Sequence, residues 1–180
     1  MIRAVLFDLD GTILDTNELI FLSLEYAWER MRWKPPARER LIPRMGDSLL
    51  DIIRTEGEAA DEGSVEAAAR HYQEHYAVHH DAFVRSFPNV NETIAELRGR
   101  GVALGLVTTK RRKPTELGLR LCGLDDAFGV IVTGSDVTRF KPDPEPVRKA
   151  VEALGAAPGE TLMVGDSAAD IMSAAAAGVR

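Results

Sequence analysis

The chain has 180 residues, 45% of them hydrophobic and 28% charged, which suits one soluble domain or one domain with an insertion. Its formal net charge of −6 argues against a nucleic-acid partner, because binding to the phosphate backbone needs clustered lysines and arginines. The single cysteine, Cys122, excludes an internal disulfide and is interpreted as a small buried apolar residue. With no signal-peptide pattern and no apolar run near the roughly 18 residues of a membrane span, we expect a cytoplasmic protein without a membrane partner.

Residues 2–7 begin the chain with an apolar run that predicts a buried strand. Asp8 and Asp10 follow it at a spacing of two, and Gly11 ends the pattern. Alternate residues of an extended segment point to the same side, so both carboxylates aim beyond the strand end, where open α/β sheets bind ligands. Mg²⁺ would relieve the repulsion between them. An acidic turn explains this stretch alone equally well.

The next part of the chain has helical periodicity and no convincing strand. Its predicted helices cover residues 17–32, 48–55 and 64–82, and Pro35 and Pro36 end the first of them. We therefore expect residues 16–84 to form a small all-helical cap, inserted after the first strand and packed over the strand ends.

From residue 85 onward, predicted helices and strands alternate. The helices are expected at residues 91–99, 114–121, 145–154 and 170–177, and the strands at residues 102–107, 130–132 and 161–164. This rhythm is typical of a parallel sheet with right-handed crossovers. The predicted fold class is α/β, with residues 1–15 and 85–180 forming a Rossmann-like core.

Polar side chains follow the predicted strands of this core. They are Asp8 and Asp10, then Thr108 and Thr109, then Lys141, and finally Asp166 and Asp170. The carboxyl ends of parallel strands share one edge, so these residues can converge. Carboxylates, an ammonium and a hydroxyl suit phosphoryl transfer, with one carboxylate as nucleophile and another as general acid and base. Lys110, beside Thr109, is interpreted as a surface residue.

Four segments of the chain resemble the motifs of the haloacid dehalogenase superfamily, in the same order and spacing. They are DLDGT at residues 8–12, VTTK at residues 107–110, KPDPEP at residues 141–146 and GDSAAD at residues 165–170. The phrases FPNV, KPDPEP and MVGDSAADI are most similar to the group of phosphoglycolate phosphatases and PpaX-type pyrophosphatases. The resemblance also implies the small helical cap.

The resemblance implies a role for each motif residue. Asp8 would be the nucleophile and a metal ligand, and Asp10 the general acid and base, giving its backbone carbonyl to the metal. Thr108 and Lys141 would hold the phosphoryl group, with the backbone of Thr109 assisting, and Lys141 would offset the charge of Asp8. Asp166 would bind Mg²⁺, and Asp170 would support the metal site through waters or Lys141. The expected function is Mg²⁺-dependent hydrolysis of a small phosphorylated metabolite through an aspartyl-phosphate.

Other functions stay open at this point. A sugar-phosphate mutase would use the same nucleophile, and a non-catalytic phosphate-binding or regulatory protein would keep the same site. The stretch HYQEH at residues 71–75 matches a zinc-protease pattern, but an ordinary solvated helix face explains it better.

The chain ends at Arg180, soon after the last predicted helix. Members of the family it resembles continue with at least one more strand beside the fourth, and Val179 and Arg180 are similar to the start of that strand. We therefore predict an unpaired edge on the strand at residues 161–164, which would favour self-association.

Overall fold

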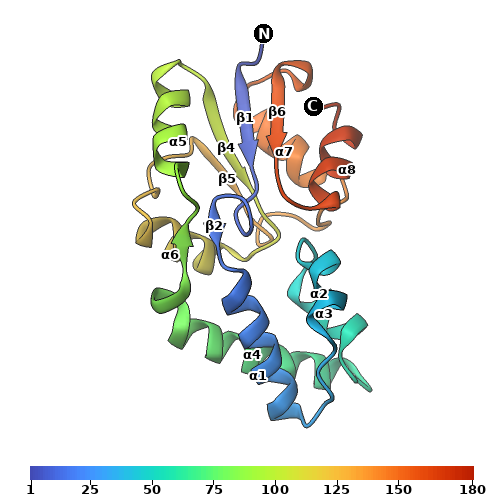
Figure 1. Ribbon diagram of the computed structural model, residues 1–180. Helices are drawn as coiled ribbons and strands as arrows, with labels where there is room; N and C mark the ends of the chain where they lie inside the picture. The colour runs from blue at the N-terminus through green and yellow to red at the C-terminus, as the bar shows by residue number, and fades with distance from the viewer. The chain divides into compact units, whose positions relative to one another are not determined.

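A computed structural model describes residues 1–180, and their contacts divide the chain into two compact units (Figure 1). The α/β unit joins Met1–Asp15 to Arg85–Arg180, and the helical unit is Thr16–Val84. The chain therefore leaves the α/β unit after its first strand and returns to it 70 residues later, at Arg85.

The α/β unit is built on a four-stranded sheet. Its strands are β1 (Ala4–Phe7), β4 (Ala103–Val107), β5 (Val130–Val132) and β6 (Thr161–Val164), in the order β5-β4-β1-β6. Every neighbouring pair in this sheet is parallel, and every residue of β1 is buried. Continuous apolar runs are what a parallel sheet covered on both faces requires. The predicted α/β fold with a parallel, Rossmann-like sheet is confirmed.

Four helices accompany this sheet, together with the short η2 (Pro158–Glu160). They are α5 (Val90–Gly99), α6 (Arg112–Leu121), α7 (Glu145–Ala153) and α8 (Ala168–Ala176). Apolar side chains of α7 and α8 pack with the sheet into one buried cluster, whose members are Leu6, Val107, Val132, Val147, Ala150, Val151, Ala174 and Val179. This cluster anchors the strands whose ends carry the candidate site.

Two of these helices begin two residues earlier than predicted. In α6 the start is Arg112 and not Pro114, because a proline is tolerated in the first turn, where backbone N–H groups have no helical partner. In α8 the start is Ala168 and not Asp170. Here Ser167 accepts a hydrogen bond from the Asp170 backbone while the Asp170 carboxylate accepts one from the Ser167 backbone, a capping box that places Asp170 in the first turn.

The helical unit contains five helical segments. They are α1 (Asn17–Met31), α2 (Arg38–Leu41), η1 (Ile42–Arg44), α3 (Leu49–Glu56) and α4 (Glu62–Phe83). The long helices α1 and α4 pack along each other and bury small and apolar side chains, among them Leu24, Ala27, Trp28, Val65 and Ala68. None of the helices combines the length and apolar character needed to cross a bilayer.

A short antiparallel ribbon joins the two places where the chain passes between the units. It consists of β2 (Leu14–Asp15) and β3 (Arg85–Ser86), with Leu14 opposite Ser86 and Asp15 opposite Arg85. Each strand has only two residues, too few for the alternation by which a strand is recognised in sequence. The sequence analysis did not predict it.

The outer edge of β6 is partly paired, contrary to the prediction. Although β6 is the last strand of the sheet, the Met163 N–H donates to the Arg180 carbonyl at 2.8 Å, and the Arg180 N–H donates to the Thr161 carbonyl at 3.2 Å. Arg180 thus adds to the sheet in the way expected of a further strand. Self-association through this edge stays a prediction.

Candidate active site

The register of the sheet brings the predicted site residues to one edge. Phe7 of β1 pairs with Leu106 of β4 on one side and with Val164 of β6 on the other. The next residue, Asp8, donates its backbone N–H to the Val164 carbonyl at 2.9 Å. Thr108 leaves β4 at the same edge, with its N–H bonded to the Val132 carbonyl at 3.0 Å. Residues far apart in sequence therefore meet where these strands end.

Lys141 is the centre of the buried part of this edge. Its ammonium contacts Asp8 Oδ1 at 2.8 Å, Asp170 Oδ1 at 2.5 Å and the Val107 carbonyl at 3.1 Å. The Lys141 side chain is 1% exposed and that of Asp8 is 7% exposed. A lysine ammonium has three hydrogens to donate, and three acceptors surround it here. For Lys141 to bind a phosphoryl oxygen, as predicted, one of these contacts must be exchanged.

Burial shifts the ionisation of this cluster. It raises the pKa of Asp8 to about 7, because the neighbouring Lys141 offsets only part of the loss of solvent and Asp170 adds like charge. Burial acts in the opposite direction on Lys141, but the two carboxylates outweigh it and raise the pKa of the ammonium. Lys141 is therefore a permanent cation, whereas Asp8 needs a further positive charge to be fully ionised at neutral pH.

The residues of this edge fit a hard divalent cation. Carboxylate oxygens of Asp8, Asp166 and Asp170 lie within 4.8 Å of one another, and oxygen donors of this kind are what Mg²⁺ prefers. Asp170 is already engaged on both oxygens, by Lys141 and by the backbone and hydroxyl of Ser167. Asp166 is exposed and receives one hydrogen bond, from Thr12 Oγ1 at 3.2 Å. Asp8 and Asp166 are thus the carboxylates best placed to bind a metal directly, with Asp170 bracing the cluster.

Asp10 has a separate partner, Lys110, whose interpretation as a surface residue is wrong. The Lys110 ammonium contacts Asp10 Oδ1 at 2.7 Å and Oδ2 at 3.0 Å. The two side chains are only 12% and 16% exposed. Nothing in the local sequence distinguishes such a lysine from one that points to solvent, because its direction is set by the loop after β1.

Thr108 and Thr109 occupy the turn that follows β4. Thr108 is buried, and its Oγ1 accepts the Lys110 backbone N–H at 3.1 Å. Thr109 is half-buried, and its carbonyl lies so close to Gly134 that a Cβ there would be 2.3 Å from the oxygen. Gly134 therefore lets the turns after β4 and β5 approach each other.

Two glycines make room for the carboxylates of the cluster. Gly11 has a φ of +80°, and a Cβ on it would lie 2.2 Å from Asp166 Oδ2. A Cβ on Gly165 would lie 2.4 Å from Asp170 Cγ. Both distances are far below a normal contact, so a Cβ at either position would force the neighbouring carboxylate to move. The motifs DLDGT and GDSAAD contain these glycines, but the neighbours that require them are visible only in three dimensions.

The histidines of the zinc-protease pattern have other partners in the helical unit. On α4, His71 Nδ1 lies 3.4 Å from Glu74 Oε2, and His75 Nδ1 lies 3.0 Å from the Ser23 hydroxyl of α1. The His75 ring stacks on Tyr26, and burial together with His79 lowers the pKa of His75. These contacts make His75 a packing residue between the two long helices, whereas His71 lies beside Glu74 of its own helix.

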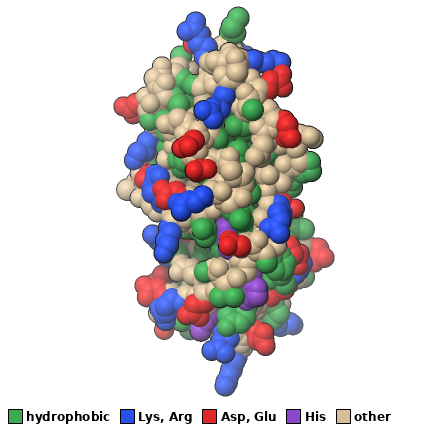
Figure 2. All heavy atoms as spheres, turned by 90° about the vertical axis from the view of Figure 1, so that its left-hand side faces the viewer, with side chains coloured by type: hydrophobic (Ala, Val, Ile, Leu, Met, Phe, Trp, Pro, Cys, Tyr) green, Lys and Arg blue, Asp and Glu red, His purple; other side chains and the backbone are tan.

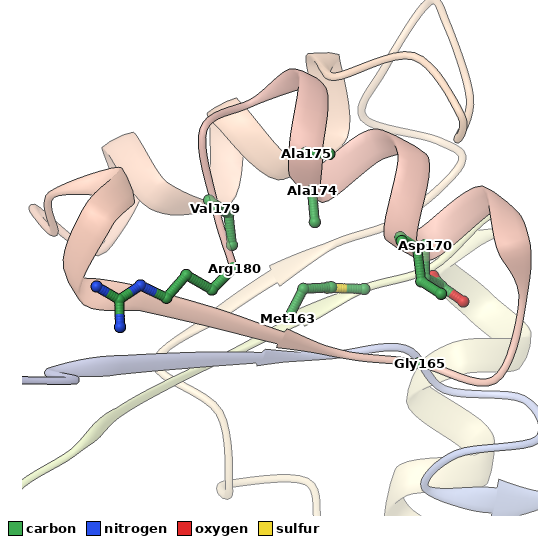
Figure 3. A pocket seen from close by; sticks show the side chains of 8 residues that line it. Met163, Gly165, Asp170, Ala174, Ala175, Val179 and Arg180 are labelled. Carbon is green, nitrogen blue, oxygen red and sulfur yellow. The ribbon is translucent and has the colours of Figure 1, made fainter.

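An apolar pocket of about 160 Å³ lies between β6 and α8 (Figure 3). Met163, Ala174 and Val179 line it, and the Asp170 carboxylate at one end points away from Val179 and Arg180. The pocket is therefore separate in character from the charged cluster. On the face shown in Figure 2, lysine and arginine side chains are mixed with acidic ones, so no extended patch of one sign marks that face.

Comparison with known proteins agrees with this geometry. The family model of haloacid dehalogenase-like hydrolases matches residues 5–180, and the chain belongs to this family. The recognition made from the four motifs is confirmed.

Among individual relatives, the chain is 42% identical over 179 residues to the pyrophosphatase PpaX of Bacillus cereus (strain AH820), covering 99% of this chain and 81% of that protein. A solved haloacid dehalogenase-like hydrolase from Bacteroides fragilis superposes with a TM-score of 0.93 at 31% identity, over 99% of this chain and 85% of the other. A predicted phosphoglycolate phosphatase from Haemophilus somnus 129pt superposes with a TM-score of 0.86 at 27% identity, over 99% and 83% of the two chains.

Proposed function

We propose that this hydrolase is a Mg²⁺-dependent phosphatase that acts on a small phosphorylated metabolite through an aspartyl-phosphate on Asp8. The observation that supports the proposal is the convergence of Asp8, Asp166 and Asp170 at the edge of the sheet, where Lys141 contacts Asp8 and Asp170. The similarity to PpaX pyrophosphatase and to a predicted phosphoglycolate phosphatase favours pyrophosphate and phosphoglycolate as the first substrates to test.

Asp8 supplies the nucleophilic oxygen in this mechanism. It attacks phosphorus as the bond to the leaving oxygen breaks, and an acyl phosphate forms on the carboxylate. Formation of the acyl phosphate removes the negative charge of Asp8, while the phosphoryl oxygens remain anionic. The Lys141 contact now made to Asp8 Oδ1 is therefore the one that can pass to a phosphoryl oxygen, while the contacts to Asp170 and Val107 hold the ammonium in place.

Asp10 acts as the general acid in the step that forms the intermediate and as the general base in the step that hydrolyses it. It gives a proton to the leaving oxygen in the first step, and in the second it takes one from the water that attacks phosphorus and releases Asp8. The Thr108 hydroxyl and the N–H groups of its turn would orient phosphoryl oxygens. Mg²⁺, held by Asp8 and Asp166 with the Asp10 carbonyl, would neutralise charge on the substrate when bound.

Release of inorganic phosphate tests the proposal. Purified protein is assayed on pyrophosphate, phosphoglycolate, sugar phosphates and p-nitrophenyl phosphate, with Mg²⁺ or with EDTA. We expect Mg²⁺-dependent turnover of at least one metabolite, and its loss by at least about 10⁴-fold in Asp8→Asn, because the nucleophile is gone. Asp125→Asn, an exposed carboxylate outside the site, is the matched control and should keep full activity.

Two results would contradict the proposal. Turnover by Asp8→Asn at the normal rate would show that Asp8 is not the nucleophile. Stable binding of phosphate with no turnover of any substrate, in the presence of Mg²⁺, would point to a phosphate-binding protein instead.

A further inference from the structure

The candidate site contains two lysine–aspartate groups that are built differently. Lys141 contacts two carboxylates and a carbonyl in the interior, whereas Lys110 contacts the two oxygens of a single carboxylate, Asp10. The first group places a permanent cation 2.8 Å from the buried nucleophile Asp8. The second group pairs one ammonium with one carboxylate, and its role in the site needs a separate explanation.

The backbone of Lys110 is fixed before its side chain reaches Asp10. Its N–H donates to Thr108 Oγ1 at 3.1 Å, and its carbonyl accepts the Gly134 N–H at 2.9 Å. The turn after β4 is therefore tied both to its own first residue and to the turn after β5. The Lys110 side chain is 12% exposed and extends from this fixed backbone. It has therefore lost most of the rotational freedom of a surface lysine.

Asp10 lies in a tight turn in which the Gly11 N–H donates to the Leu14 carbonyl and the Leu14 N–H donates to the Leu9 carbonyl. These bonds fix the chain but leave the rotation of the Asp10 side chain to its own contacts. Lys110, which grips both carboxylate oxygens from 100 residues away, restricts that rotation.

We infer that Lys110 is a positioning residue for Asp10, holding the carboxylate in the orientation from which it passes a proton to the leaving group. The inference rests on the proposed function, since it assigns a role within that reaction. In the first step the Asp8–phosphorus bond forms and the bond from phosphorus to the leaving oxygen breaks. Asp10 enters this step protonated on one oxygen, with Lys110 bonded to the other, and its proton moves to the leaving oxygen. Lys110 touches neither phosphorus nor the transferred proton, and acts only by where it holds Asp10.

This role makes the importance of Lys110 depend on the leaving group. An alkoxide is a poor leaving group and needs the proton as the bond breaks, so misplacing Asp10 slows its departure. p-Nitrophenolate is a stable anion and leaves without one. A loss of positioning should therefore be large on an alkyl phosphate and small on p-nitrophenyl phosphate, whereas loss of folding or of a phosphate contact would affect both.

The test compares Lys110→Met with wild type on phosphoglycolate and on p-nitrophenyl phosphate, using kcat/KM, which reports the steps up to leaving-group departure. We expect a loss of about 10- to 100-fold on phosphoglycolate, the scale of a misplaced catalytic group, and of less than about threefold on p-nitrophenyl phosphate. Lys110→Arg, which keeps a cation, should recover part of the loss. Lys113→Met, an exposed lysine three residues on, is the matched control and should match wild type.

A double-mutant cycle tests whether Lys110 acts through Asp10. In an Asp10→Ala background, Lys110→Met should change kcat/KM by less than about twofold, because the group it positions is absent. An equal loss on both substrates with a raised KM would overturn the inference and make Lys110 a substrate-binding residue. Unchanged kinetics on phosphoglycolate would overturn it as well. If wild type with Mg²⁺ hydrolyses none of the phosphorylated compounds tested, pyrophosphate included, the proposed function itself fails, which is a different result.

Discussion

One ion-pair cluster in the α/β unit and one in the helical unit lie in opposite environments. In the α/β unit, Lys141 and its partners Asp8 and Asp170 are almost wholly buried. In the helical unit, Arg38 pairs with Glu18 and Glu25 on the surface, where all three side chains are at least 38% exposed. Burying charge is unfavourable unless every charge is compensated, whereas exposed pairs contribute little. Buried charge is therefore retained where the proposed chemistry needs it, and the four predictions that follow test that contrast.

The largest effect is expected from Lys141→Met. Removing the ammonium leaves Asp8 and Asp170 buried without their cation, which should lower the free energy of unfolding by about 3–5 kcal/mol. Urea denaturation followed by circular dichroism measures it. A loss below about 1 kcal/mol would mean that the cluster is not a compensated set of buried charges.

A smaller effect is expected from Gly11→Ala, whose new Cβ would collide with the Asp166 carboxylate. Displacing a metal-binding carboxylate should weaken Mg²⁺ affinity by about 10- to 100-fold, as changes around metal ligands do. Isothermal titration with Mg²⁺ measures the affinity. The control is Gly101→Ala, which has a similar φ of +75° but nothing within 4 Å of its Cβ, so it shares only the backbone strain. Equal Mg²⁺ affinity in the two variants would argue against Asp166 as a ligand.

The pKa of Asp8 predicts a pH effect in metal-free protein. The folded-state pKa of about 7 lies above the ordinary value of 3.8, so folding takes up a proton between these values. The stabilisation from protonated Asp8 is complete below about pH 4 and is lost as pH rises through 7. Relative to Asp8→Asn, the free energy of unfolding of wild type should fall by about 1 kcal/mol or more between pH 4 and 7.5 in EDTA. A constant difference between the two proteins across this range would rule out the raised pKa.

The smallest effect is expected from Arg38→Met in the helical unit. The Arg38 guanidinium lies 2.7 Å from Glu25 and 2.9 Å from Glu18, and 5.1 Å from the Phe21 ring. Because the pair is exposed, its removal should change the free energy of unfolding by no more than about 1 kcal/mol, and less at high salt. A loss as large as that of Lys141→Met would remove the contrast between the buried and the exposed cluster.

The sequence alone predicted most of the fold, because apolar periodicity is strong in these elements. Continuous apolar runs identified β1, β4, β5 and β6, and helical spacing identified the long helices α1 and α4. The features that the sequence did not predict depend on contacts between particular residues. The start of α8 depends on the capping box of Ser167 and Asp170, and the ribbon of β2 and β3 on pairing of segments 70 residues apart.

The sequence predicted that the motif residues converge at one edge of the sheet, but it did not predict the contacts among them. Motif spacing named Asp8, Lys141 and Asp166, and the parallel sheet explains why they meet. The pairing of Lys110 with Asp10 was missed, because a lysine after a strand has the same sequence signature whether it points to solvent or to a carboxylate. The engagement of all three Lys141 donors was missed for a similar reason, since one of its acceptors is a backbone carbonyl, Val107.

The register of β1 has a consequence for how folding of this protein should be assessed. All four residues of β1 are buried, so a shift by one position against β4 and β6 would still enclose apolar side chains. The same shift would turn Asp8 to the other face of the sheet, because successive side chains alternate. A misaligned molecule could thus retain normal secondary structure and compactness and yet be inert. Enzymatic turnover therefore reports strand alignment, which a measurement of secondary-structure content such as circular dichroism would not detect.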